Sequence, residues 1–91
     1  MSETSNETWS IAIDVVITGD NGTAHAVLTK EDGQRVEGYG RARRNPDDEP
    51  HPEVGQELAT ARALRDLADR LLKATSDDLS RIEHQKIRLA R

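Results

Sequence analysis

Four arginines within ten positions are the residues of this 91-residue chain best suited to chemistry: Arg35, Arg41, Arg43 and Arg44. Guanidinium groups stay protonated and match phosphate with paired hydrogen bonds, so such a cluster is typical of surfaces that contact nucleic-acid backbone. An acidic block at residues 47–49 follows directly. Two interpretations are therefore open: the arginines contact phosphate, or they pair with this block and with acids of neighbouring strands.

Other chemistry has little basis in the sequence. His25, His51 and His84 are far apart and lack a second ligand at metal-binding spacing, so we expect no metal site. The stretch "GYGRAR" has only the first two glycines of a dinucleotide-binding loop, and no nucleophile elbow or phosphate-binding loop occurs. Cysteine is absent. We therefore expect no catalytic residue, no cofactor and no small-molecule substrate.

Charge along the chain is segregated, although the net charge is −4. Residues 1–34 carry one base and six acids, residues 35–44 four bases and one acid, residues 45–61 five acids only, and residues 62–91 eight bases and five acids. The acidic total argues against a chain built wholly to coat nucleic acid. With neither a signal-like start nor a long apolar run, we expect a cytoplasmic protein without membrane contact.

The elements that must position the arginines begin with three strands. Alternating apolar residues predict strands at about 9–18, 23–30 and 34–44, joined by turns at "TGDNG" and "EDG". The alternation puts Trp9 and the isoleucines of the first strand on the inner face, with Trp9 expected in the core. Gly38 and Gly40 also fall on that face, which indicates that a helix crosses the sheet close to the backbone there.

Helices are predicted after the proline-containing loop at residues 45–52. Leucines and alanines at spacings of three and four predict an amphipathic helix at about 53–74, and Ser76 as an N-cap predicts a short second helix at about 77–84. Ile87 and Leu89 are candidate anchors of the tail. The prediction is an α+β fold of order β-β-β-α-α, with a disordered tail at 1–8 and one domain at 9–91.

An open sheet face and free strand edges predict a homodimer, because a small domain with a thin core gains stability from pairing. Val27, Tyr39 and Ile82 are the candidate residues of a dimer or partner surface.

Three segments carry a resemblance to a known family: "TWSIAIDV", "GYGRARRNPDD" and "PEVGQELATARALRDLADRLLKATSDDLSRIEH". They resemble the small actinobacterial family of double-stranded-RNA-binding-like domains of unknown function, which includes a dormancy-induced mycobacterial protein. The resemblance covers about residues 9–89. It implies a three-stranded sheet with C-terminal helices, a dimer, and kinship with ribosome hibernation-promoting factors, and it implies no catalytic residue.

Two hypotheses for function follow. In the first, a stress- or dormancy-associated dimer binds the ribosome or structured RNA through the four arginines. In the second, the chain is a protein-interaction module that binds no nucleic acid.

Overall fold

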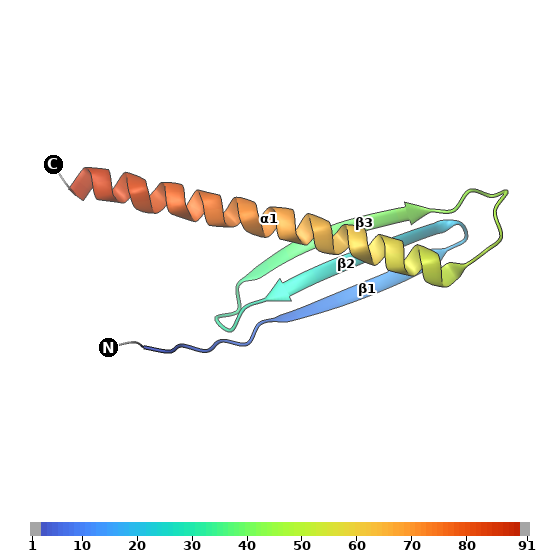
Figure 1. Ribbon diagram of the computed structural model, residues 1–91, viewed down its shortest axis with the longest axis horizontal. Helices are drawn as coiled ribbons and strands as arrows, with labels where there is room; N and C mark the ends of the chain where they lie inside the picture. Colours follow the sequence, from blue (N-terminus) through green and yellow to red (C-terminus); the bar gives the residue numbers. More distant parts are fainter. Residues whose placement is uncertain (1–2, 90–91) are drawn as a thin grey trace.

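A three-stranded antiparallel sheet and one long helix make up the chain (Figure 1). The computed structural model describes the backbone of residues 3–89 and the side chains of residues 3–85. Strands β1 (Ser10–Thr18), β2 (Asn21–Thr29) and β3 (Arg35–Arg43) lie in sequence order, and helix α1 (Pro52–Leu89) covers one face of the sheet. The predicted α+β class and the three strands are confirmed. The strand bounds differ from the prediction by at most two residues.

The turns fix the register of the sheet. Gly19 adopts a φ of 58° in the two-residue turn between β1 and β2, a conformation that glycine accepts without strain. The resulting pairs place Asp14 opposite His25 and His25 opposite Tyr39. Alternate residues therefore point toward α1, and those between them point to the open face of the sheet.

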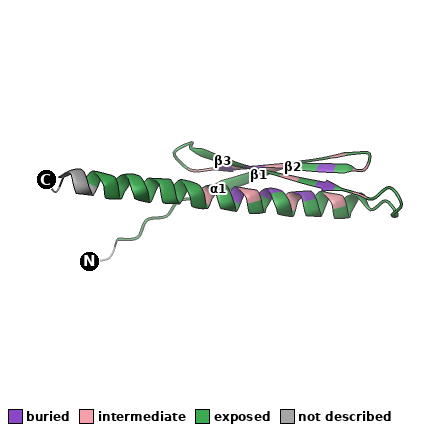
Figure 2. Cartoon of the chain, turned by 90° about the horizontal axis from the view of Figure 1, so that it is seen from above, coloured by how far each residue is buried: buried purple, intermediate pink, exposed green. Residues whose placement is uncertain are grey.

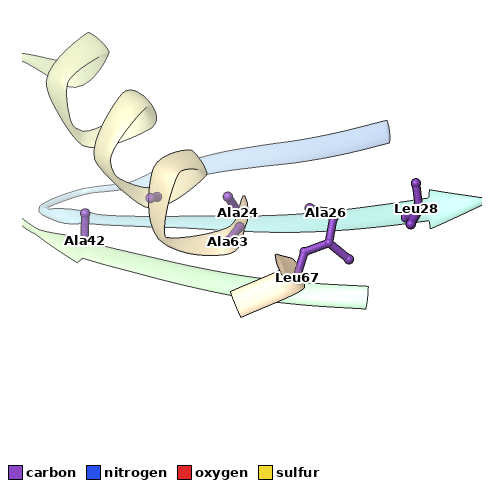
Figure 3. Close-up of a cluster of buried hydrophobic side chains, with 7 residues drawn as sticks. Ala24, Ala26, Leu28, Ala42, Ala63 and Leu67 are labelled. Atoms are coloured by element: carbon purple, nitrogen blue, oxygen red, sulfur yellow. The ribbon is translucent and has the colours of Figure 1, made fainter. Parts of the chain in front are cut away.

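The core is built from small side chains between the sheet and the first half of α1. Its buried members are Ala24, Ala26, Leu28, Ala42, Ala59, Ala63 and Leu67 (Figure 3). Small residues let the helix axis come close to the sheet. The distance between the backbones of α1 and β3 is shortest at the two glycines of β3. A Cβ on Gly40 would lie 2.1 Å from the carbonyl oxygen of Ala59, and one on Gly38 would lie 2.4 Å from that of Ala63. The predicted close approach of a helix to these glycines is confirmed.

Strand β1 is covered least. Ile13 packs against the core and Ile17 is partly buried, but Ile11 and Val15 on the same face stay exposed. The prediction for Trp9 is wrong: its side chain is 43% exposed, and its Nε1 donates to Glu7. Trp9 precedes the first paired residue of β1, and α1 lies mainly over β2 and β3, so the helix does not bury the ring. Lys30 Nζ lies over the ring, 5.2 Å from its centre.

The prediction of two helices is also wrong, because α1 continues without a break through residues 74–77. No glycine or proline occurs after Gly55 in the helix. Thr75 Oγ1 donates to the carbonyl of Leu71 at 3.0 Å, and Lys73 pairs with Asp77 at 3.0 Å. Side-chain contacts one turn apart support a continuous helix, so Ser76 is an interior residue rather than an N-cap.

The second half of α1 projects beyond the sheet (Figures 1 and 2). All described side chains from Leu72 to Gln85 are exposed. The candidate anchors Ile87 and Leu89 lie outside the residues whose side chains are described. Among the described residues there is no helix with the combined length and apolar character that a membrane span needs.

Candidate nucleic-acid interface

The arginines of β3 point to the open face because they occupy the odd positions of the strand. Gly38 and Ala42, at even positions, are buried under α1, whereas Arg41 and Arg43 are exposed. The pairing places Arg41 beside Thr23 of β2, and Arg43 beside Asn21. The Cα atoms of Arg41 and Arg43 are therefore about 7 Å apart along one edge of the sheet, and the residues that they pair with on β2 are uncharged.

Arg44 has a different role from its neighbours. Its guanidinium forms an ion pair with Asp20 in the β1–β2 turn and donates to the carbonyl oxygens of Asn45, Pro46 and Asp48. The side chain thus fixes the loop after β3 to the first hairpin, and both of its terminal nitrogens are engaged within the chain. Arg44 is a structural residue.

Arg41 and Arg43 form no ion pair with the described side chains, and neither does Arg35. The acidic block at residues 47–49 does not neutralise them, since its one contact with an arginine is the Asp48 carbonyl on Arg44. Arg35 lies at the opposite end of β3, about 20 Å from Arg41 along the strand. The four predicted arginines therefore separate into one free pair, one distant arginine and one structural arginine.

The centre of the open face holds a polar cluster of Asp14, His25, Glu37 and Tyr39. The His25 and Tyr39 rings stack with centroids 4.6 Å apart. Nε2 of His25 is buried 3.3 Å from Oε1 of Glu37 without hydrogen-bond geometry, and the Tyr39 hydroxyl donates to the same carboxylate at 3.4 Å. Arg70 lies 5.3 Å from the centre of the Tyr39 ring. With neighbours on both sides, Tyr39 is not a free stacking surface for a base.

Two hollows adjoin the arginine pair. One of about 350 Å³ lies on the open face between Asp14, Thr23, His25 and Arg41. The other, of about 460 Å³, lies at the end of the sheet, where basic and acidic side chains share its walls: Arg43, Arg44, His51, Asp20 and Glu49. Its mixed charge does not favour an anionic small molecule. In the described part of the chain, no three His, Asp or Glu side chains are grouped as metal ligands.

Helix side chains close the outer edge of β3. Asp66 accepts a hydrogen bond from the backbone N–H of Tyr39 at 2.8 Å, and Arg62 donates to the carbonyl of Arg41 at 2.7 Å. Asp66 is held by Arg70 at 3.2 Å. No local pattern in the sequence indicates the two contacts with β3, because each of them joins residues more than 20 positions apart.

We expect Asp66→Ala to destabilise the domain by about 1 kcal/mol, since the N–H of Tyr39 loses a charged acceptor. Amide exchange at Tyr39 should accelerate roughly fivefold or more, corresponding to that free energy. Exchange measured by NMR checks this, with Asp69→Ala on the same helix as the control. Equal exchange at Tyr39 in both variants would contradict the closed edge.

The candidates for a dimer or partner surface do not come together. Val27 and Tyr39 lie on the open face of the sheet, where Val27 is half-buried. Ile82 lies on the projecting half of α1. In the described part of the chain, these three residues therefore do not form one continuous surface for a partner.

A solved structure has the same fold as this chain. The crystal structure of Rv2632c superposes with a TM-score of 0.81 at 38% sequence identity, over 91% of this chain and 98% of that one.

Sequence relatives are mycobacterial. An uncharacterized protein of Mycobacterium bovis, Mb1767, is 50% identical over 52 residues, which are 57% of this chain and 55% of that protein. Rv2632c of Mycobacterium tuberculosis, also uncharacterized, is 47% identical over 55 residues, which are 60% of this chain and 59% of that protein. The aligned segment thus spans little more than half the length of these relatives. The family model described as Rv2632c-like matches residues 7–88, and the chain therefore belongs to the Rv2632c-like family.

Proposed function

We propose that this chain is a non-enzymatic cytoplasmic domain that binds the phosphate backbone of structured RNA, with the ribosome as the first candidate. The observation that carries the proposal is the pair Arg41 and Arg43, both exposed on the open face and neither in an ion pair with a described side chain. The resemblance to double-stranded-RNA-binding-like domains with a dormancy-induced member supports a role under stress or dormancy.

The geometry favours backbone contact over base reading. Two arginines whose Cα atoms are about 7 Å apart on one strand face can each contact one phosphate, and neither needs to break an ion pair with a described side chain first. The Tyr39 ring on the open face lies between His25 and Arg70. Recognition by shape and phosphate, which is how double-stranded RNA is commonly bound, suits such a surface better than stacking on splayed bases.

A protein-interaction module without nucleic-acid binding remains the second hypothesis, but its predicted surface has less support. Val27, Tyr39 and Ile82 do not share a face. In addition, α1 side chains close the β3 edge against strand addition at Tyr39 and Arg41.

The test is co-sedimentation of the purified protein with 70S ribosomes and, separately, binding to a double-stranded RNA over a salt series. Two phosphate contacts predict a slope of log affinity against log salt of about −2, which lowers affinity roughly tenfold between 50 and 200 mM salt. Two copies that bind together would double the slope. A double-stranded DNA of equal length is the control for preference of RNA over DNA.

Binding to neither ribosomes nor RNA at 50 mM salt would refute the proposal. Binding that is insensitive to salt would refute the role of the arginines, because counterion release is the expected driving force.

A further inference from the structure

Strand β1 is an edge strand whose outer side is free (Figure 1). Hydrogen bonds in an antiparallel pair alternate along each strand, so every second residue of β1 turns its N–H and C=O away from β2. The N–H of Tyr39 points away from β2, toward Asp66, and its partner His25 therefore bonds to β1. Asp14, which pairs with His25, bonds to β2 in turn. The residues whose backbone groups point outward are those that alternate with Asp14: Ile11, Ile13, Val15 and Ile17.

No part of the described chain closes this edge. Outside the strand pairing, no hydrogen bond among the described residues reaches the backbone of these four residues. The opposite edge differs, because Asp66 and Arg62 bond to the backbone of β3. Exposed edge strands are commonly protected by proline, lysine or a bulge, and β1 contains none of them. It therefore has the free donors and acceptors that a further strand needs.

Apolar side chains lie exposed beside the free edge. Ile11 is 50% exposed and Val15 37%, because α1 lies mainly over β2 and β3. Leu64 of α1, 38% exposed, lies about 160° around the helix from Arg62, which contacts the outer edge of β3. Leu64 therefore lies on the flank of α1 toward β1. We call Ile11, Val15 and Leu64 the apolar shelf, and a strand added to β1 would cover this shelf with alternate side chains.

Charge beside the edge selects the kind of strand. Residues 1–18 carry three acids, of which Asp14 lies in β1, and no lysine or arginine. Glu57 lies seven residues before Leu64, on the same flank of α1. Asp14 and Glu57 form no ion pair with the described side chains. A basic segment would neutralise these acids, whereas β1 of a second copy would bring further acids to the edge.

We propose that β1 binds an extended, basic segment of another protein, which adds to the sheet as a fourth strand. Apolar residues at alternate positions of the segment pack on the apolar shelf, and the lysines or arginines between them lie beside Asp14 on the open face. Main-chain hydrogen bonds to β1 supply affinity, and the alternation of apolar and basic side chains supplies specificity. Arg41 and Arg43 lie on β3, at the other edge of the sheet, so this binding does not depend on the proposed contact with RNA.

The first experiment follows the backbone amides of β1 by NMR. The probe is an acetylated and amidated nine-residue peptide that alternates lysine and valine. At saturation it should shift the amide signals of Ile11, Ile13 and Val15 and slow their hydrogen exchange at least about tenfold, because these N–H groups gain acceptors. The amide of Ala12, which already bonds to β2, is the internal control. No change at the three amides with up to about 2 mM peptide would overturn the proposal.

Changed peptides separate strand addition from simple attraction between charges. A peptide with glutamate in place of lysine should bind at least about tenfold more weakly. Two further peptides keep the lysines and are N-methylated at every valine or at every lysine. Because only alternate N–H groups of an added strand face β1, one of these two peptides should bind at least about tenfold more weakly and the other should bind nearly as well as the probe. Equal affinity of both for the protein would refute strand addition.

Variants of the protein locate the binding surface. Ile11→Lys removes part of the apolar shelf and should raise the dissociation constant of the probe at least about tenfold. Ile82→Lys makes the same change at a similarly exposed isoleucine, 46% against 50%, on the projecting half of α1, and should change it by no more than about twofold. Asp14→Asn should weaken binding about two- to fivefold. Equal effects of the two lysine variants would contradict a site at β1.

Dilution of the natural chain without peptide tests for a second copy at the edge. Hydrogen exchange at Ile11, Ile13 and Val15 should be the same at about 300 μM and about 10 μM protein, because no copy of the chain occupies the edge. Protection that is lost on dilution would show that a second copy pairs with β1, and it would overturn the proposal.

Discussion

Replacement of Gly40 by alanine is expected to lower the melting temperature by at least about 10 °C, the largest loss of stability that any single added methyl group should cause in this domain. The new Cβ would lie 2.1 Å from the Ala59 carbonyl oxygen and 2.3 Å from the Ala63 nitrogen. Both atoms belong to the helix backbone, so no side chain can move aside, and α1 itself must shift away from the sheet. Such a shift opens the core around Ala59 and Ala63, at a cost of roughly 3 kcal/mol.

The matched control is Gly55→Ala, because this glycine lies inside α1 and a Cβ there would meet only Ile17 Cδ1, at 3.5 Å. Alanine is the better helix former, so this variant should be as stable as the natural chain or more stable by up to about 1 kcal/mol. Thermal unfolding followed by circular dichroism compares the two. Equal melting temperatures would show that α1 does not contact β3 as closely as described.

The close approach at Gly40 also explains which parts of the fold could be predicted from the sequence. Alternation of apolar residues over nine positions identifies strands, and two glycines on the inner face of a strand indicate contact with a backbone. Both inferences depend on residues adjacent in the chain. The register and the side on which α1 lies follow from them, because a strand with one buried face has little freedom to slip.

Two predictions are wrong, the helix break at Ser76 and the burial of Trp9, because a local pattern in the sequence fits more than one structure. Ser76 followed by two aspartates is typical of a helix start, yet the same residues tolerate an interior position when helix formers precede and follow them. The ion pair between Lys73 and Asp77 spans the supposed break. The place of Trp9 in the alternation predicts a core position. Its burial depends on how far α1 extends over β1, and the alternation of apolar residues contains no information on that.

The arginine cluster could be located from the sequence but not divided into roles. Arg43 and Arg44 are neighbours in the chain and equally basic. Arg44 is engaged because Asp20, 24 positions earlier, lies within reach in the β1–β2 turn. Arg43, one residue before, points to the open face instead. The difference arises from strand alternation at the last residue of β3 and from a turn that only the folded chain brings near.

These separate roles decide which arginines a charge-reversal experiment should change. A variant that reverses all three arginines at residues 41–44 would also disrupt the Asp20 pair and the loop, so lost binding could reflect a damaged fold. Arg44→Ala alone should destabilise the domain by roughly 1–2 kcal/mol, because Asp20 and the loop carbonyls lose their donor. Its affinity for RNA at a temperature where it is folded should stay within about threefold of the natural chain, since the variant loses one neighbouring charge but no proposed phosphate contact.

The double variant Arg41→Glu with Arg43→Glu should behave in the opposite way. Neither side chain makes an internal ion pair with the described residues, so the melting temperature should change by no more than about 3 °C. Affinity for double-stranded RNA or ribosomes at 50 mM salt should fall at least about a hundredfold, because two phosphate contacts become two repulsions. Binding and thermal unfolding measured on both variants separate a phosphate-contacting pair from a structural arginine. If Arg44→Ala abolishes binding and the double variant retains it, the interface lies at the loop after β3 and not on the open face of the sheet.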